Sequence, residues 1–252
     1  MSPNTVTWTK GDWALFLDVD GTLLDIAETP QGVHVPESLK SLLVNTSIHL
    51  DGALALVSGR SLDDIDRLFA PLRLCVSAVH GNERRDAFGC VARPLAAALE
   101  YEEAREELAE FVRSRPGLLL EDKRSALAVH FRRAPHLSAD VHTKIKRVYE
   151  RLKPRYALQA GKCVFELHPS EWTKGRSIDA FMRQQPFLGR VPIFVGDDIS
   201  DESGFVAVNT AGGMSIRVGD TGATLAQHRM RTVREVLGWL ERAAGQSLGA
   251  PD

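Results

Sequence analysis

The sequence predicts an α/β protein in which a doubly wound parallel sheet is interrupted by a smaller α+β insert with an antiparallel sheet. Towards both ends of the chain, short apolar strands alternate with amphipathic helices, and several of these strands end in small and polar residues. Between Leu95 and Leu167 the pattern changes to a helix followed by two strands, and this unit occurs twice. The first pattern then resumes, so we expect the insert to lie within the parallel domain.

Local patterns predict the elements of both domains. For the parallel domain we expect buried strands at residues 14–17, 53–57, 75–79, 191–195 and 214–218, and helices at 36–43, 62–68, 176–183 and 233–243. For the insert we expect helices at 95–113 and 136–152, and strands at 118–123, 126–132, 156–160 and 163–167. The predicted core domain therefore covers residues 1–100 and 172–252, and the predicted insert covers residues 101–171.

Composition limits the class of function. The 252 residues are 44% hydrophobic and 25% charged, as in ordinary soluble globular proteins, and a formal net charge of −2 gives no reason to expect nucleic acid or an anionic membrane as partner. Cys75, Cys90 and Cys163 lack metal-type spacing, so neither disulfides nor zinc are expected. Residues 1–10 lack a signal-peptide pattern and no apolar run suits a membrane span, so we expect a cytoplasmic protein.

Two carboxylates follow the first buried strand directly. The sequence Asp-Val-Asp-Gly occupies residues 18–21, and residues i and i+2 of an extended chain point the same way, so Asp18 and Asp20 leave the strand on one side. In open α/β sheets the chemistry lies outside the carboxyl ends of the strands. A simple turn would also suit this sequence. A calcium loop would not, because its twelfth position requires Glu and is here Thr29.

Further polar residues at strand and helix ends complete a candidate site. Asp18, Asp20 and Asp197 are a plausible metal set, because oxygen ligands suit a hard cation such as Mg²⁺. Asp198 and Asp201 follow in the same stretch, where they either support the metal site or cap the next helix. A serine beside free backbone N–H groups, as at Ser58, and a lysine at the restart of the parallel pattern, as at Lys174, would together bind phosphate.

These residue types together favour phosphoryl transfer through a carboxylate nucleophile. In this interpretation Asp18 attacks phosphorus, while Mg²⁺ and Lys174 neutralise the equatorial oxygens. Asp20 protonates the leaving alcohol and later activates water. Taken alone, however, Lys174 would be an ordinary surface lysine.

The order of these motifs resembles that of the haloacid dehalogenase-like phosphatases. Asp-Val-Asp-Gly-Thr-Leu from residue 18, Ser58, Lys174 and Gly-Asp-Asp-x-x-Asp from residue 196 match the four motifs of that superfamily. The resemblance implies a Rossmannoid core with an inserted cap domain, Asp18 as nucleophile and Asp20 as acid/base. It also implies Mg²⁺ on the Asp18 carboxylate, the Asp20 main-chain carbonyl and Asp197, with Thr22 and Ser58 at the phosphate.

A narrower resemblance is to the trehalose-6-phosphate phosphatase family. It is carried by Ser58-Gly59-Arg60, His80-Gly81-x-Glu83, Glu121-Asp122-Lys123, Glu166-Leu167-x-Pro169 and Trp172-x-Lys174-Gly175. The resemblance implies that the cap decides substrate specificity and holds the sugar hydroxyls through Glu121, Lys123 and Glu166. On the core it implies substrate contacts from Gly59, Arg60, His80, Gly81 and Glu83. The implied reaction is hydrolysis of trehalose 6-phosphate in trehalose biosynthesis, with a small sugar phosphate as the binding partner.

Several alternatives remain at the level of sequence. Arg60 could instead pair with Asp63 or Asp64 at the surface, and His130 and Arg132 alternate on a strand of the insert, where they face either the substrate or elsewhere. The nearest enzymatic alternative is a capped phosphatase for sucrose phosphate or mannosyl-3-phosphoglycerate. The alternative of another class is a non-catalytic regulatory protein that binds sugar phosphates, although such a protein would not need a nucleophile.

Overall fold

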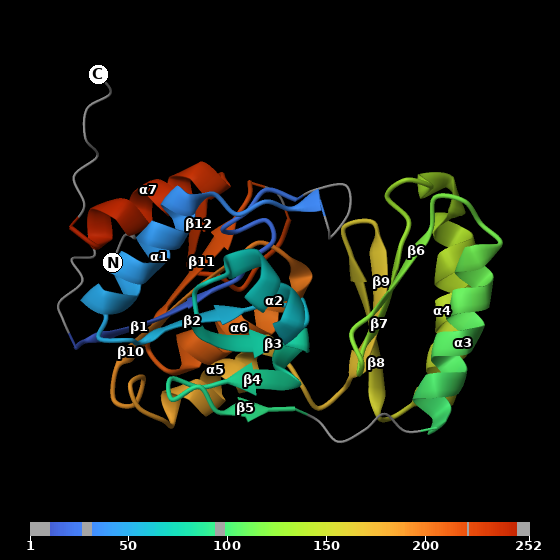
Figure 1. The fold of residues 1–252 in the computed structure, drawn as a ribbon, viewed down its shortest axis with the longest axis horizontal. Helices are drawn as coiled ribbons and strands as arrows, with labels where there is room; N and C mark the ends of the chain where they lie inside the picture. The colour runs from blue at the N-terminus through green and yellow to red at the C-terminus, as the bar shows by residue number, and fades with distance from the viewer. Residues whose placement is uncertain (1–10, 27–31, 94–98, 221, 246–252) are drawn as a thin grey trace. The chain divides into compact units, whose positions relative to one another are not determined.

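The computed structural model describes residues 11–26, 32–93, 99–220 and 222–245. The chain divides into two compact units, of which one comprises Met1–Val91 and Lys174–Asp252 and the other Ala92–Thr173. The sequence suggested an insert of residues 101–171, whereas this division assigns residues 92–173 to the second unit. Each unit is built on its own sheet (Figure 1). The first residues of the helix expected from Leu95 lie outside the described residues, as do residues 27–31 of the loop that precedes Val35.

The first unit, which we call the core, contains an eight-stranded sheet with the order β12-β11-β10-β1-β2-β3-β4-β5. Strand β1 (Trp13–Leu17) lies in the middle and pairs in parallel with β10 (Val191–Gly196) and β2 (Leu54–Val57). Parallel pairing continues to β3 (Cys75–Ala78) on one side and to β11 (Met214–Val218) on the other. The carboxyl ends of these strands therefore meet at one edge of the sheet, where the candidate residues follow them.

Three short strands of this sheet are not evident in the sequence. They are β4 (Glu83–Arg85), β5 (Val91–Ala92) and β12 (His228–Met230). Strand β4 pairs antiparallel to β3, and β12 extends the parallel sheet beyond β11. The sequences Glu-Arg-Arg and His-Arg-Met carry no buried apolar run, so their extended conformation is decided by the neighbouring strand rather than by local propensity.

Helices cover both faces of the core sheet. Helices α1 (Glu37–His49) and α7 (Val233–Ala243) pack together on one face, and α5 (Lys174–Met182) and α6 (Glu202–Thr210) pack together on the other (Figure 1). Helix α2 (Leu62–Phe69) and the short 3₁₀ helices η3 (Val79–Gly81) and η5 (Ile199–Asp201) connect strands to the next elements. This is the doubly wound arrangement that the sequence predicts. None of the described helices has both the length and the apolar character that crossing a membrane requires.

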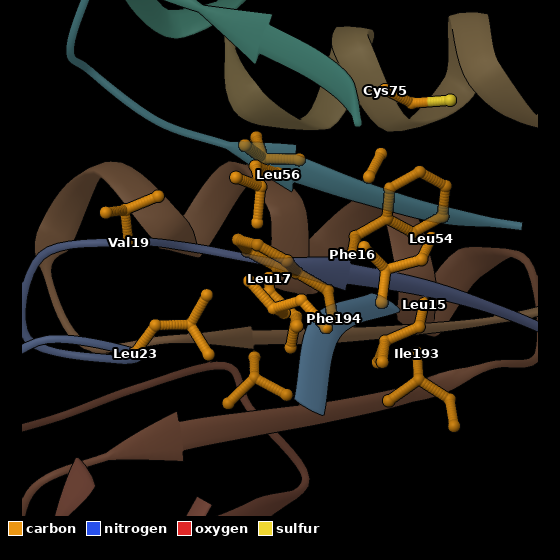
Figure 2. Close-up of a cluster of buried hydrophobic side chains, with 14 of the residues drawn as sticks. Leu15, Phe16, Leu17, Val19, Leu23, Leu54, Leu56, Cys75, Ile193 and Phe194 are labelled. Atoms are coloured by element: carbon orange, nitrogen blue, oxygen red, sulfur yellow. The ribbon is translucent and has the colours of Figure 1, made fainter. Parts of the chain in front are cut away.

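Strand β1 is buried on both faces, as its apolar sequence predicts. Figure 2 shows Leu15, Phe16 and Leu17 among side chains from β2 and β10, and all three are fully buried. Phe16 stacks on Phe187 with ring centroids 5.3 Å apart. Buried, close-packed side chains hold their backbone in place, so the carboxyl end of β1 is a rigid base for the residues that follow it.

The second unit, which we call the insert, has a four-stranded antiparallel sheet with the order β6-β7-β9-β8. The strands are β6 (Leu119–Asp122), β7 (Leu127–His130), β8 (Tyr156–Gly161) and β9 (Val164–Pro169). Helices α3 (Leu99–Arg113) and α4 (Ser138–Leu152), the latter preceded by the 3₁₀ helix η4 (Pro135–Leu137), pack on one face of the sheet. The alternate residues of each strand point to the opposite face.

That opposite face of the insert sheet is polar. The strand register places Glu121, Ala128, Glu166 and Gln159 side by side across β6, β7, β9 and β8. The neighbouring residues Leu127, Val129 and Leu167 belong to the hydrophobic cluster under the helices. The alternation of residues in these strands thus separates a face that packs under the helices from a face that carries Glu121 and Glu166.

Candidate active site

The central feature of the core is a cluster of carboxylates at the carboxyl ends of β1 and β10. The backbone N–H of Asp18 donates to the carbonyl of Val195 at 2.9 Å, which fixes Asp18 beside the end of β10. Asp18, Asp197 and Asp201 are all buried, and each offers a carboxylate oxygen within 4.8 Å of the others. The structure therefore brings together Asp18 and Asp197 as the sequence predicts. The Asp20 carboxylate, which the sequence placed in the metal set, is not part of this group, and Asp201 takes its place.

Gly21 lets Asp197 approach the backbone of the turn after β1. Its φ of +85° lies in the left-handed region, which glycine adopts without strain. A Cβ atom at this position would lie 2.1 Å from Oδ2 of Asp197. The Asp197 carboxylate therefore packs directly against the main chain that follows Asp20. This places the groups that the sequence assigns to one metal ion next to each other.

Lys174 is the cation of this cluster. It begins helix α5, is buried, and its Nζ lies 2.6 Å from Oδ1 of Asp18 and 2.6 Å from Oδ1 of Asp201. Burial disfavours the charged form of a lysine, but the two carboxylates outweigh it and raise the pKa of Lys174. Lys174 is therefore a charged ammonium held by both partners, and the surface-lysine interpretation is wrong.

Asp201 acts as the scaffold of the cluster. Its Oδ1 accepts from Lys174, while its Oδ2 accepts from the backbone N–H groups of Asp197, at 2.9 Å, and Asp198, at 2.8 Å. Asp201 packs so closely on Gly196 that a Cβ there would lie 2.3 Å from its Cγ. Because both oxygens already accept hydrogen bonds, Asp201 orients Lys174 and the Asp197 backbone. The metal position is better served by Asp18 and Asp197.

Charge balance in the cluster favours a divalent cation. The carboxylates of Asp18, Asp197 and Asp201 are buried within one cluster, and Lys174 pairs with those of Asp18 and Asp201. Burial raises the pKa of Asp18 well above its ordinary value, Lys174 opposes this rise, and Asp201 and Asp197 add to it. A hard cation beside these carboxylates would offset their negative charge and favour the ionised form of Asp18. An all-oxygen donor set of carboxylates and a main-chain carbonyl fits Mg²⁺.

Asp20 forms a bidentate pair with Arg60. Arg60 Nε donates to Asp20 Oδ2 at 2.6 Å, and a terminal nitrogen of the same guanidinium donates to Oδ1 at 2.7 Å. The side chain of Asp20 is 35% exposed, more than those of the other carboxylates of the site. Asp64, one partner that the sequence suggested for Arg60, instead pairs with Ser61 and Arg67. The pairing of Arg60 with the second carboxylate of the Asp-Val-Asp motif was missed in the sequence.

Ser58 follows β2, the strand next to β1, at the same edge of the sheet. Its backbone N–H donates to Ser77, and its Oγ accepts from the backbone N–H of Arg60 at 3.1 Å. Thr22 is fully buried, and among the described residues its Oγ1 has no hydrogen-bond partner. A buried hydroxyl without a partner costs free energy, so Thr22 is a candidate for contact with a bound ligand.

The loop after β3 packs against the loop after β2. His80 is buried and left-handed, with a φ of 56°, and its backbone N–H donates to the carbonyl of Ser58 at 3.2 Å. A Cβ on Gly59 would lie 3.0 Å from the His80 ring, so this glycine permits the close contact. Glu83 is also buried, and its Oε2 accepts from the backbone N–H of Leu62 at the start of α2. Gly81, with a φ of 113°, completes the turn between them.

A second polar cluster lies on the insert. Lys123 Nζ lies 2.9 Å from Oε1 of Glu166 and 3.9 Å from Oε2 of Glu121, and all three side chains are largely buried. Oε2 of Glu121 also lies 2.8 Å from Nε2 of His130. Burial alone would raise the pKa of Glu121, but Lys123 and the His130 hydrogen bond outweigh it and lower that pKa. The structure thus brings together the three insert residues that the sequence analysis named, and His130 joins them.

Comparison with known proteins decides the family. The family model of the trehalose-phosphatases matches residues 16–231. The chain belongs to the trehalose-phosphatase family. A probable trehalose-phosphate phosphatase of Sinorhizobium fredii is 46% identical over 208 residues, which cover 82% of this chain and 78% of the relative. The trehalose-6-phosphate phosphatase of Escherichia coli is 44% identical over 232 residues, which cover 91% and 85%.

Solved structures agree on the fold of this trehalose-phosphatase. The C-terminal domain of the Candida albicans trehalose-6-phosphate phosphatase has a TM-score of 0.79 at 22% identity, covering 94% of this chain and 93% of that one. A phosphatase of the haloalkanoate (HAD) enzyme superfamily from Bacteroides thetaiotaomicron has a TM-score of 0.62 at 17% identity, covering 93% and 95%. The predicted fold, a haloacid dehalogenase-like core with an α+β insert, is confirmed. The protein is an enzyme, a phosphoric monoester hydrolase.

Gly21→Ala tests the contact between the β1 turn and Asp197. We expect turnover of p-nitrophenyl phosphate to fall by roughly 10²-fold or more, because the new methyl group displaces the Asp197 carboxylate. Gly52→Ala is the matched control, since Gly52 has nearly the same φ of +84° but its Cβ would only touch Pro186 at 3.6 Å. In both variants the left-handed backbone of an alanine costs about 1–2 kcal/mol of folding free energy, which should lower the Tm of each. Equal turnover in the two variants would contradict this reading of the site.

Proposed function

We propose that the protein hydrolyses trehalose 6-phosphate to trehalose and inorganic phosphate, with Mg²⁺ as cofactor and a phosphate ester on Asp18 as intermediate. The observation that carries the proposal is the buried cluster of Asp18, Lys174, Asp197 and Asp201 in a chain of the trehalose-phosphatase family. The sugar is supported by the relatives at 44–46% identity, whose names specify trehalose phosphate. We place the reaction in the cytoplasm, with a small sugar phosphate as partner and neither nucleic acid nor membrane.

Asp18 is the proposed nucleophile. Lys174 holds its Oδ1 at 2.6 Å, and among the described residues no donor reaches its Oδ2. The carboxylate attacks phosphorus, the new O–P bond forms, and the bond from phosphorus to the sugar oxygen breaks. The Lys174 ammonium lies beside the charge that builds up on the phosphoryl oxygens, where a fixed cation in a dry site contributes most.

Asp20 is the proposed acid and base. It donates a proton to the sugar oxygen as that group leaves, and it then takes a proton from the water that attacks the phosphate ester on Asp18. That second attack breaks the O–P bond to Asp18 and releases inorganic phosphate. Arg60 donates to both oxygens of the ionised Asp20 carboxylate and orients it, so Arg60 is part of the proposed substrate site. The acid step requires the protonated form of Asp20, in which one of these oxygens is released from Arg60.

Magnesium fits the donor set of the core. The Asp18 and Asp197 carboxylates and the main-chain carbonyl of Asp20 would hold the ion, while Asp198 and Asp201 would lie behind these groups. A bound Mg²⁺ supplies positive charge for the phosphate and for the excess carboxylates of the site. The hydroxyls of Thr22 and Ser58 would contact the phosphate, with Gly59, His80, Gly81 and Glu83 shaping the loops behind them.

The insert is proposed to be the specificity cap, which selects the sugar. Glu121, Lys123 and Glu166 form a charged cluster on the polar face of its sheet. Charge-assisted hydrogen bonds from such groups suit a ligand rich in hydroxyls, which both donates and accepts. The core would then supply phosphate chemistry common to many esters, and the insert would supply the preference for a disaccharide.

A substrate panel with and without metal tests the proposed function. We expect phosphate release from trehalose 6-phosphate with the highest kcat/KM, ahead of sucrose phosphate and mannosyl-3-phosphoglycerate. Excess EDTA should remove the activity, because the carboxylate cluster loses the cation that balances it, and added Mg²⁺ should restore it. A higher kcat/KM for another ester would overturn the substrate. No turnover of any ester would favour a regulatory protein.

Asp18→Asn tests the nucleophile. Turnover should fall by more than roughly 10³-fold, because an amide oxygen does not form the phosphate ester. The variant should remain folded, because Lys174 keeps its contact with Asp201, and circular dichroism checks this. Asp12→Asn, at an exposed position before β1, is the control and should retain full activity. Substantial activity in Asp18→Asn would show that water attacks phosphorus directly.

Glu121→Ala and Glu166→Ala test the role of the insert. Each should lower the ratio of kcat/KM for trehalose 6-phosphate to that for p-nitrophenyl phosphate by roughly 10-fold or more, because each removes a charged hydrogen-bonding partner of the sugar. Glu103→Ala, an exposed residue of α3, should leave the ratio unchanged. An unchanged ratio in the two test variants would assign sugar selection to other residues.

A further inference from the structure

His130 lies on the polar face of the insert sheet, diagonally across from Glu121. The register pairs His130 of β7 with Leu119 of β6, and Ala128 with Glu121. His130 and Glu121 are therefore diagonal neighbours on adjacent strands, a spacing that long side chains bridge. The bridge is formed, with 2.8 Å between His130 Nε2 and Glu121 Oε2.

The two oxygens of Glu121 differ in their surroundings. Oε2 takes the hydrogen bond with His130 and lies 3.9 Å from Lys123 Nζ. Within the part of the chain that the structure describes, Oε1 accepts no hydrogen bond, although the Glu121 side chain is only 12% exposed. One oxygen is thus fixed by the protein, and the other is left to accept a hydrogen bond from a ligand.

His130, rather than Lys123, fixes the direction of the Glu121 carboxylate. At 3.9 Å the ammonium attracts the carboxylate but is too distant for a hydrogen bond, whereas 2.8 Å with a ring N–H is a directional one. The ionised carboxylate only accepts, so the proton lies on Nε2 of the imidazole. A glutamate without this bond has several rotamers and would move towards Lys123, which already pairs with Glu166 at 2.9 Å.

We propose that His130 is a positioning residue for sugar recognition, which holds Glu121 away from Lys123 with Oε1 presented to a hydroxyl group of the substrate. This inference rests on the proposed function, because it assumes that the polar face of the insert binds the sugar. His130 itself acts through Glu121. The Glu121 side chain is thereby ordered before the substrate binds, so binding does not include the loss of entropy for ordering it.

The test compares His130→Phe, which keeps a ring without an N–H, with His130→Gln, whose amide N–H reaches a similar place. His130→Phe should lower kcat/KM for trehalose 6-phosphate by roughly 10-fold, while turnover of p-nitrophenyl phosphate and the Tm stay near wild type. His130→Gln should recover most of the loss. His136→Phe, at an exposed position of η4, is the matched control and should change neither substrate.

A double-mutant cycle separates positioning from direct contact. In the Glu121→Ala background His130 has no carboxylate to hold, so His130→Phe should cause no further loss. Additive losses would show that His130 contacts the sugar itself and would overturn the proposal. Wild-type activity in His130→Phe, failed rescue by His130→Gln, or equal losses on both substrates would also overturn it.

The failure of the proposed function would be visible in the wild type alone. An enzyme that hydrolyses p-nitrophenyl phosphate but not trehalose 6-phosphate would refute the substrate before any variant is compared. The cycle would then use the best sugar phosphate of the panel, and the same coupling between His130 and Glu121 would support or overturn the positioning role.

Discussion

The contact of Lys174 with Asp18 and Asp201 is the interaction on which the rest of the core site depends. A buried ammonium or carboxylate costs several kcal/mol in lost hydration unless it is paired. Here one ammonium joins the end of β1, the loop after β10 and the start of α5, with 2.6 Å to each carboxylate. Lys174 pairs with two carboxylates while a third, Asp197, lies in the same cluster. In the proposed function, this group of carboxylates holds a cation and, with it, the phosphate.

The surroundings of this contact keep its geometry fixed. Asp201 uses both oxygens within the protein, and glycines at positions 21 and 196 let carboxylates pack directly on the backbone. Beneath them, β1 is buried on both faces of a close-packed sheet. Preorganised charges act without rearrangement during the reaction, which is why a rigid base favours phosphoryl transfer. The close packing of the core thus keeps a few polar groups in fixed positions.

In the proposed function, chemistry and recognition belong to separate folding units. The core carries the carboxylates and the lysine, while the insert has its own hydrophobic cluster and presents a charged face of Glu121, Lys123 and Glu166. The apolar residues that stabilise the insert lie on the opposite face of its sheet. The polar face is therefore able to vary with the substrate without loss of the fold, which is consistent with one core serving many phosphatases.

The sequence alone determined the elements and residues that depend on local pattern. Strand β11 has the predicted bounds, the insert has the predicted helix–strand–strand order, and Asp18, Lys174 and Asp197 were recognised because their motifs end strands or begin a helix. Tertiary structure alone decided what depends on pairing between distant segments. The charged strand β4 is extended because β3 pairs with it, and the pairs Arg60–Asp20 and His130–Glu121 join different elements of the chain. Such contacts follow from sheet register and side-chain packing, which single-residue propensities do not encode.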